Sequence, residues 1–468
     1  MKKDFASDAL RDLLGNRVPD WARVLLFALA TAVFGIFAYH ARYALLDEYG
    51  GFRIGELTML TAVVFTALYA VMMAVQLHAG RKLPLYVQIL LCVTAGVILL
   101  GKISLLDYVS DDYSIFLNDW IYAYTDMGIK EGLGAYIPSD YTPPYLYLLL
   151  LISRVKEYPW QYLVKAVSML WEILMAYAVM KLASLRVKSD GKKLLIFNMA
   201  TLLPTVVFNG AYWAQCDVIY VSFCLMALYM GLTKRGAASM AFFGVALSFK
   251  LQTVFFLPVL LPLWLRKDIK LRHLLMIPAA YMAMMVPALW GGKSLHHVLF
   301  RYFGQAGTYN FMTVNGPCLY NFLPKSAAQE EMLYEMFSKM AICLGMAMLI
   351  AVCAMLCVRR DHITKKSTVL ACLLVLAGVP FFLPKMHERY TFGADILSLV
   401  AAVYSPKLAI LPLLYGFASY ICYTAGLPGD SILPLKWATI IQGAAIALTA
   451  AALWRSLHEE EDAWEVKA

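Results

Sequence analysis

Apolar runs long enough to cross a membrane recur along most of the sequence, and short polar stretches separate them. A helix that spans a bilayer needs about 20 mainly apolar residues, or slightly fewer where other helices shield it. Runs of about this length fall near 22–40, 57–78, 83–106, 160–183, 194–212, 215–232, 274–290, 339–358, 368–383, 391–404, 407–425 and 434–454. The pattern therefore predicts an all-α fold, a polytopic transmembrane helical bundle of about 12–14 membrane segments.

Two further apolar runs do not fit a single span. The run 239–265 is too long for one helix and is interrupted by Lys250, so we expect a hairpin that enters and leaves by the same face. The run 145–152 follows two prolines and is too short to cross a bilayer. We expect it to form a juxtamembrane or re-entrant segment on the outer side.

Composition and charge support a membrane protein. Of the 468 residues, 61% are hydrophobic and only 15% are charged, which leaves too little polar surface to cover a soluble globule. A net charge of +9 would suggest nucleic-acid binding in a soluble protein, but here Lys and Arg fall in short loops between apolar runs. We therefore expect no nucleic-acid partner. The nine cysteines show no paired C-x-x-C spacing, so we expect neither a disulfide framework nor a zinc site.

The basic residues also set the orientation of the bundle, because cytoplasmic loops carry an excess of Lys and Arg. With a cytoplasmic N-terminus, alternation of the spans places most basic clusters inside, including 81–82, 186–193, 234–235, 266–272 and 359–366. The other polar stretches then share the outer face, namely 107–142, 209–217, 291–338 and 384–390, with Lys250 at the hairpin tip. We expect them to meet at one external cavity.

The stretch 384–390 carries four titratable side chains between two apolar runs, Lys385, His387, Glu388 and Arg389. Ionisable residues at membrane depth are costly and usually face a cavity, although a buried charge network that fixes helix packing is an alternative. Lys250 interrupts its apolar run in the same way, which suits either a bound phosphate or an internal ion pair. Together these residues predict a cationic pocket that faces a carboxylate.

Candidate carboxylates lie in two other polar stretches. Asp111 and Asp112 directly follow a span, where a carboxylate can take a proton from an acceptor hydroxyl as a general base; the alternative is that they solvate the loop or cap a helix. Trp213 and Asp217 lie at i and i+4, so on a helix they would share a face. An acid beside aromatic rings suits sugar binding, and an aromatic belt residue with an interfacial acid is the alternative.

Two other polar pairs carry no assigned chemistry. Lys165 and Glu172 are seven residues apart, on one helix face, and could pair with each other. His296 and His297 lack the spacing of a metal site, so we expect no metal and no cofactor.

A reaction on the outer face has no supply of nucleotide sugars, so its activated group would come from the lipid phase. A polyprenyl-phosphate sugar already carries a good leaving group. Its transfer needs one base for the acceptor hydroxyl and cations for the departing phosphate. Attack opposite the leaving group would invert the anomeric centre.

The same motifs resemble the GT-C superfamily of integral-membrane glycosyltransferases, and most of all bacterial members related to the GPI-anchor mannosyltransferases. The resemblance covers roughly 83–425 and rests on Asp111-Asp112-Tyr113, 141–145, 213–217, 249–252 and 384–390. It implies a catalytic acid at Asp112 or Asp111, of which we favour Asp112. It implies phosphate contacts from Lys250, His387 and Arg389. By the same resemblance we expect these residues to contact substrate: Trp213, Gln215, Asp217, Glu388 and Tyr141.

These observations lead to one main hypothesis. We expect 1–82 to hold the N-terminal tail and two spans, 83–425 the catalytic module with external loops 107–159 and 291–338, and 426–468 the last span and a cytoplasmic tail. The hypothesis is an inverting hexosyltransferase, with mannose as the guess from the resemblance, in the bacterial plasma membrane with its active site facing outward. Its partners would be membrane lipids, a polyprenyl-phosphate sugar, and a glycan, lipid or protein acceptor. A lipid-linked saccharide flippase or secondary transporter is the rival, and a non-catalytic envelope protein is a third possibility.

Overall fold

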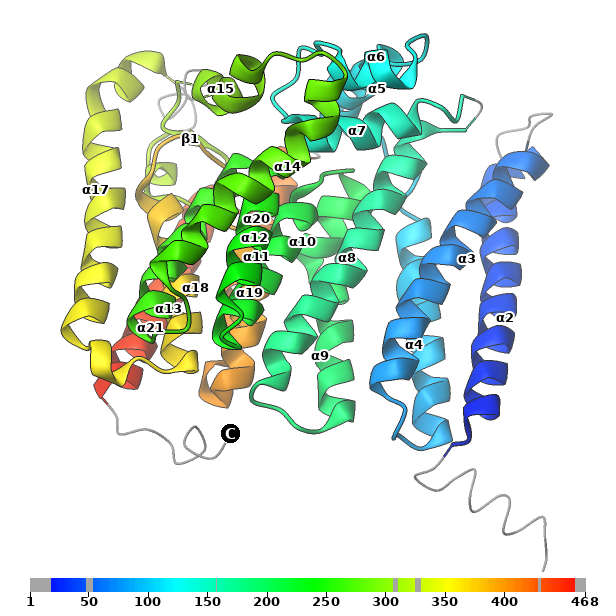
Figure 1. Cartoon of the computed structure of the whole chain (residues 1–468), viewed down its shortest axis with the longest axis horizontal. Coiled ribbons are helices and arrows are strands. Elements are labelled where there is room, and N and C mark those ends of the chain that lie inside the picture. The colour runs from blue at the N-terminus through cyan, green and yellow to red at the C-terminus, as the bar shows by residue number, and fades with distance from the viewer. Residues whose placement is uncertain are drawn as a thin grey trace, which may run out of the picture.

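The computed structural model describes residues 18–47, 54–156, 158–305, 310–324, 330–427 and 431–458, and helices dominate these ranges (Figure 1). The long helices run mostly in one direction, up and down the bundle. They are α2 (Asp20–Asp47), α3 (Ile54–Ala79), α4 (Leu85–Ile103), α8 (Trp160–Ser184), α9 (Asp190–Leu202), α11 (Asp217–Leu232), α12 (Gly236–Phe249), α14 (Met276–Trp290), α17 (Glu331–Val358), α18 (Lys365–Phe382), α19 (Phe392–Tyr404), α20 (Leu411–Gly426) and α21 (Leu435–His458).

Nine helices within the described ranges are long and apolar enough to cross a membrane, or ten if one bent pair forms a single span. This confirms an all-α, multi-pass membrane protein. The remaining predicted segments correspond to shorter apolar helices, among them α11, α12 and α19. The bent pair corresponds to the run 194–212, for which no bend was predicted. α9 ends at Leu202, and the chain turns by 52° into the helical stretch Pro204–Tyr212, which begins with α10 (Pro204–Val207), because a proline disfavours continuation of the helix that precedes it.

The run 239–265 was predicted to form a hairpin interrupted at Lys250, and the helix does end at that position. α12 ends at Phe249, and Lys250 adopts extended backbone with φ −153°. Two short 3₁₀ helices, η3 (Leu251–Phe255) and η4 (Leu257–Val259), then lead to α13 (Leu260–Leu265), which lies toward the lower end of the bundle in Figure 1. Lys250 is therefore displayed at the upper end of two helical segments.

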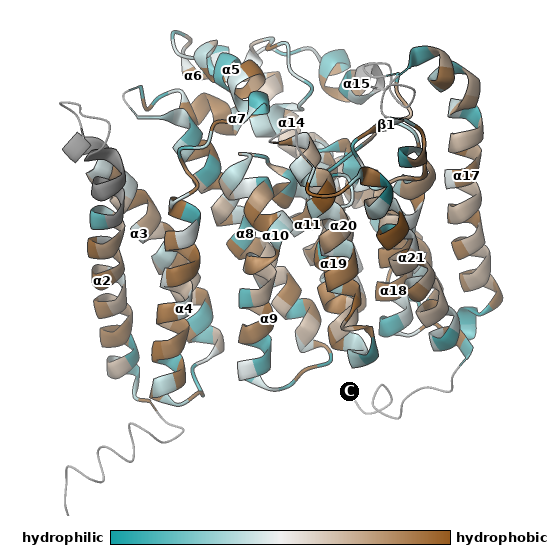
Figure 2. Cartoon of the chain, turned by 180° about the vertical axis from the view of Figure 1, so that it is seen from behind, coloured by the Kyte–Doolittle hydropathy of each residue, from teal (hydrophilic) through white to brown (hydrophobic). Residues whose placement is uncertain are grey.

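Short helices cover the upper end of the bundle in Figure 1: α5 (Asn118–Tyr122), α6 (Ile129–Gly134), α7 (Pro143–Ile152) and α15 (Leu295–Gln305). α7 contains the run 145–152, and its ten residues are too few to span. The loops α3–α4, α8–α9 and α17–α18 lie at the lower end and carry basic clusters. Polar colouring gathers at both ends, and apolar colouring lies between them (Figure 2).

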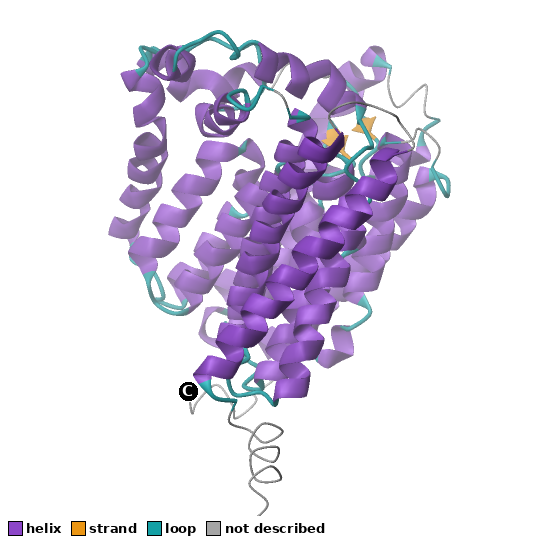
Figure 3. Ribbon diagram, turned by 90° about the vertical axis from the view of Figure 1, so that its right-hand side faces the viewer, coloured by secondary structure: helices purple, strands orange, loops and turns teal. Residues whose placement is uncertain are grey.

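Burial divides the helices into a centre and a periphery. α18 is the most buried of the candidate spans, whereas α2 and α17 expose most of their apolar side chains. α2 and α17 stand at opposite edges of the bundle in Figure 1, and a view turned by 90° shows the helices running side by side from the upper to the lower end (Figure 3). Exposed apolar helices of this kind suit contact with lipid tails. A short parallel pairing of β1 (Thr313–Val314) with β2 (Met386–His387) joins the loop 310–324 to the loop between α18 and α19. Both loops lie at the upper end, where the charged residues gather.

Candidate active site

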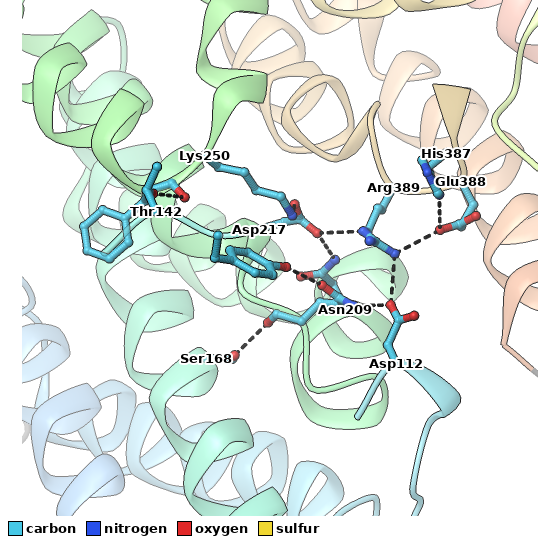
Figure 4. Close-up of polar contacts among 12 residues, drawn as sticks. Asp112, Thr142, Ser168, Asn209, Asp217, Lys250, His387, Glu388 and Arg389 are labelled. Atoms are coloured by element: carbon cyan, nitrogen blue, oxygen red, sulfur yellow. Dashed lines mark hydrogen bonds and ion pairs between the residues drawn. The ribbon is translucent and has the colours of Figure 1, made fainter. Parts of the chain in front are cut away.

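Segments that are far apart in the sequence enclose a cavity of about 350 Å³ at the upper end of the bundle. The first is the stretch after α4, the second is the turn between α10 and α11, the third is the tip after α12, and the fourth is the loop between α18 and α19 (Figure 4). Eight of the ten predicted site residues line this cavity: Asp112, Tyr141, Trp213, Gln215, Lys250, His387, Glu388 and Arg389. A ninth, Asp217, is buried directly beside it and bonds to its cations.

The two adjacent acids of the first loop have different surroundings. Asp112 directly precedes a π-helical turn, η1 (Tyr113–Leu117), and is half-buried with its carboxylate in the cavity. Its Oδ2 accepts hydrogen bonds from Gln215 Nε2 and, at 3.2 Å, from Arg389 Nη1. Asp111 is exposed and is not among the residues that line the cavity. Of the two acids, Asp112 is therefore the one whose carboxylate reaches the cavity.

The turn 208–217 aims two polar side chains at this site. It begins as a π-helical turn, η2 (Phe208–Tyr212), and continues through Ala214, whose φ of 67° is uncommon for a residue with a Cβ. The reversal directs Gln215 toward Asp112 and places Asp217 at the first position of α11. Backbone strain at such a position persists only where the surrounding structure holds it.

Asp217 is the buried anion of the site. Its Oδ2 accepts a hydrogen bond from Asn209 Nδ2 at 2.9 Å and lies 3.7 Å from Arg389 Nε, while its Oδ1 pairs with Lys250 Nζ. The tip that carries Lys250 is held by Thr142, whose hydroxyl donates to the carbonyl of Ser248 at 2.6 Å. The ammonium of Lys250 is thereby directed into the cavity.

Arg389 joins the two walls of the cavity. Its Nη1 lies 3.2 Å from both Asp112 Oδ2 and Glu388 Oε1, and its guanidinium carbon lies 5.1 Å from the centre of the Trp213 ring. Lys385, in the same loop, has a φ of 66° and directs its ammonium over the ring of Tyr334, so it does not join the cavity lining. One guanidinium therefore contacts carboxylates from the first and the last of the four segments.

The sequence predicted a cationic pocket, but in the structure carboxylates balance the positive charges of the cavity. Lys250 and Arg389 are the two cations, and they are already paired with Asp112, Asp217 and Glu388. A buried charge without a partner is strongly destabilising, so in the absence of substrate these carboxylates supply the partners. An anionic ligand must therefore compete with a carboxylate for each cation.

Burial changes the protonation of the two titratable neighbours of Arg389. Burial, with Asp112 and Asp217 nearby, raises the pKa of Glu388 from 4.5 to about 7, although Arg389 opposes the shift. Burial, with Arg389 and Lys250 nearby, lowers the pKa of His387 to about 3. His387 is therefore neutral at physiological pH, and it can contact a phosphate as a hydrogen-bond donor but not as the cation that the sequence suggested.

Several residues of the site carry no sequence signal of their own. Asn209 is a buried partner of Asp217, and Asp140, Asn315 and the ring of Trp120 line the cavity. All four fall within polar stretches that were expected to share the outer face: Asp140 and Trp120 in 107–142, Asn209 in 209–217 and Asn315 in 291–338. The pairing of β1 with β2, next to Asn315, could not be foreseen from the sequence. Residues 306–309, within the predicted external loop 291–338, lie outside the described residues.

No protein-family model and no curated protein matches the sequence. Within the part of the chain that the structure describes, no group of three or more His, Cys, Asp or Glu side chains is arranged to hold a metal ion. The chemistry of the cavity is therefore inferred from its own side chains: the half-buried carboxylate of Asp112, the buried acids Asp217 and Glu388, two cations and a neutral imidazole.

Proposed function

We propose that the protein is an inverting glycosyltransferase of the GT-C type that moves a hexose from a polyprenyl phosphate to an acceptor hydroxyl. The observation that carries this proposal is the position of Asp112, which contacts Arg389 in a cavity that shares a wall with an apolar groove. A polar cavity beside an apolar groove matches a ligand that has a sugar phosphate at one end and a lipid at the other.

The apolar groove has a volume of about 500 Å³ and lies between α12, α14 and α15. Leu251 and Tyr302 line both the groove and the polar cavity, so the two spaces share a wall. Its other lining residues are apolar or aromatic: Leu247, Val254, Ile277, Pro278, Tyr281 and Leu299. Leu251 directly follows Lys250, so a lipid chain in the groove would bring its phosphate close to that ammonium.

In the proposed reaction the acceptor oxygen attacks the anomeric carbon while the bond from that carbon to the phosphate oxygen breaks. Asp112 takes the proton of the acceptor hydroxyl, and the departing phosphate keeps the electron pair. Lys250 and Arg389 stabilise the charge that develops on the phosphate, and His387 donates a hydrogen bond. Gln215 holds the carboxylate of Asp112 through its amide.

The orientation of the bundle supports an outward-facing site. The loops at the end opposite the cavity carry the basic clusters, and such loops usually lie in the cytoplasm. We place the cavity on the outer face of a bacterial plasma membrane, where a lipid-linked sugar is an accessible donor. Mannose remains the sugar that the resemblance suggests.

The test is transfer of radiolabelled mannose from a synthetic polyprenyl-phosphate mannose by the purified protein in lipid vesicles. An alkyl mannoside, a glycolipid extract and a short Ser/Thr peptide serve as acceptors in parallel. We expect label on one acceptor, or in released sugar where water replaces the acceptor. Intact labelled lipid that crosses the bilayer without any transfer or hydrolysis would identify a flippase instead.

A further inference from the structure

α8 carries a polar face in the interior of the bundle. Lys165, Ser168 and Glu172 lie three, four and seven residues apart, so they share one side of the helix, and all three are buried. The spacing left a pairing of Lys165 with Glu172 open, but Glu172 pairs instead with Lys102 at the end of α4. A buried lysine needs hydrogen-bond partners in the interior, and Lys165 finds them in backbone carbonyls.

Lys165 binds the stretch that leads to Asp112. Its Nζ donates to the carbonyls of Leu105 at 2.8 Å, Leu106 at 3.0 Å and Tyr108 at 2.7 Å. These carbonyls belong to the non-helical chain between α4 and Asp112, which has no helix ladder to fix its path. An ammonium group that binds three carbonyls of one short stretch restricts where that stretch can go.

The next turns of α8 bind the second loop of the site. The Ser168 hydroxyl donates to the carbonyl of Gln215 at 2.7 Å. A Cβ atom at position 210 would overlap Glu172 Oε1, so only a glycine there lets the turn 208–217 approach α8 this closely. The two loops are also joined directly, because the Ser110 hydroxyl donates to the carbonyl of Trp213 at 2.8 Å. One helix face therefore holds both the loop of Asp112 and the loop of Gln215.

We propose that Lys165 and Ser168 are positioning residues, which set the place of the Asp112 carboxylate relative to Gln215 and Arg389 without touching substrate. This inference rests on the proposed function, in which Asp112 is the base. A displacement of about 1 Å at a reacting group can lower a rate about 100-fold, so loss of the anchor affects the chemical step more than donor binding.

The experiment compares Lys165→Met, Lys165→Arg and Ser168→Ala with Lys181→Met in the full-length protein in lipid. Lys181 is the matched control, because it is a lysine at the other end of α8 that lies over the rings of Tyr177 and Tyr229. Three quantities are measured: kcat for mannosyl transfer, the dissociation constant of polyprenyl-phosphate mannose, and hydrogen exchange of the peptide 104–117. Thermal unfolding confirms that each variant is folded.

For Lys165→Met we expect kcat to fall about 100-fold, donor affinity to stay within about threefold, and exchange in 104–117 to rise. Lys165→Arg keeps a cation and should recover most of kcat, whereas Ser168→Ala, which folds with one hydrogen bond fewer, should lower kcat about fivefold. Lys181→Met should match the wild type in all three quantities.

Two results would overturn the proposal. The first is unchanged exchange in 104–117 for both Lys165→Met and Ser168→Ala, and the second is a loss of donor affinity as large as the loss of kcat. If the wild type transfers no sugar, the proposed function fails; the exchange data then still decide whether α8 anchors the loop.

Discussion

The ion pairs at the two ends of the bundle differ in how far apart their partners lie in the sequence. At the lower end, Lys193 pairs with Asp190, Arg266 with Asp268, and Arg360 with Asp361, so each pair forms within one turn or loop. At the upper end, Arg389 pairs with Asp112 and Lys250 with Asp217. These partners come from different helices and loops.

This difference separates local pairing from a site that the whole fold assembles. Pairs between neighbouring residues require no particular fold, and an exposed one, such as Arg360 with Asp361, contributes little to stability. Buried charges are costly, and their partners must arrive from several segments at once. At the upper end these buried charges lie in the cavity that, under our proposal, binds substrate and catalyses the reaction. Substitutions there should therefore affect activity most.

Asp112→Asn should have the largest effect. The amide keeps the shape of the side chain but cannot accept the proton, so we expect transfer to fall about 1,000-fold, within the range for loss of a general base. Donor affinity should rise rather than fall, because the substitution removes a carboxylate that competes with the donor phosphate for Arg389. Initial rates and equilibrium binding measure the two effects.

Asp111→Asn is the matched control, because Asp111 is exposed outside the cavity lining. We expect its rate to stay within about twofold of the wild type. A loss of transfer in Asp111→Asn with normal rates in Asp112→Asn would move the base by one residue and contradict the assignment.

Removal of a cation should have the next largest effect. Lys250→Met removes an ammonium that the donor phosphate would contact, and loss of a hydrogen bond to a charged group weakens binding about 10- to 100-fold. Titration with polyprenyl-phosphate mannose measures the change. Lys385→Met, in a residue outside the cavity lining, is the control and should bind normally. Equal affinities for wild type and Lys250→Met would exclude Lys250 as a phosphate contact.

Titration of Glu388 should cause a moderate change of donor affinity with pH. Below its pKa of about 7 the side chain is neutral, so Glu388 no longer competes with the phosphate for Arg389, which keeps its pairs with Asp112 and Asp217; above that pH, the Glu388 carboxylate competes for the guanidinium. We expect donor affinity about fivefold higher at pH 6 than at pH 8, and no such difference in Glu388→Gln. His387, with a pKa of about 3, does not titrate in this window. A pH dependence that persists in Glu388→Gln would assign it to another group.

The same shift predicts how stability changes with pH. The folded protein keeps the proton of Glu388 to a higher pH than the unfolded chain does, so this group lowers stability as pH rises from about 4.5 to about 7. Unfolding of Glu388→Gln should show a smaller loss of stability over that window.

Substitution at the lower end should have the smallest effect. Arg360→Ala breaks a pair whose side chains are 68% and 85% exposed, so stability should change by less than about 0.5 kcal/mol. Thermal unfolding and the transfer rate should both match the wild type. A large loss of activity in Arg360→Ala would show that the lower end also contributes to activity, which would contradict the contrast drawn from the ion pairs.

The sequence predicts the helices well because apolar runs and their breaks are local properties. The run 368–383 corresponds to α18, and Lys250 marks the end of α12 as expected. The bend after Leu202 was missed, although Pro204 is its visible cause. The pairing of β1 with β2 was also missed, because two-residue strands have no periodicity to detect.

The residues of the site could be predicted, whereas their pairing could not. Motifs with charge at membrane depth lead to Asp112, Lys250 and Arg389, which the fold does bring together. Which carboxylate contacts which cation depends on tertiary geometry, so the charge balance of the pocket was predicted wrongly and the partners of Lys165 could not be predicted. Spacing along one helix shows which residues share a face but not what lies opposite that face.

The most direct test of the central claim is the anomeric configuration of the transferred sugar. The purified protein receives polyprenyl-phosphate mannose of defined configuration, and proton NMR reads the product before it can equilibrate. Attack opposite the phosphate, with Asp112 as base, predicts complete inversion. Retention of configuration would contradict the account.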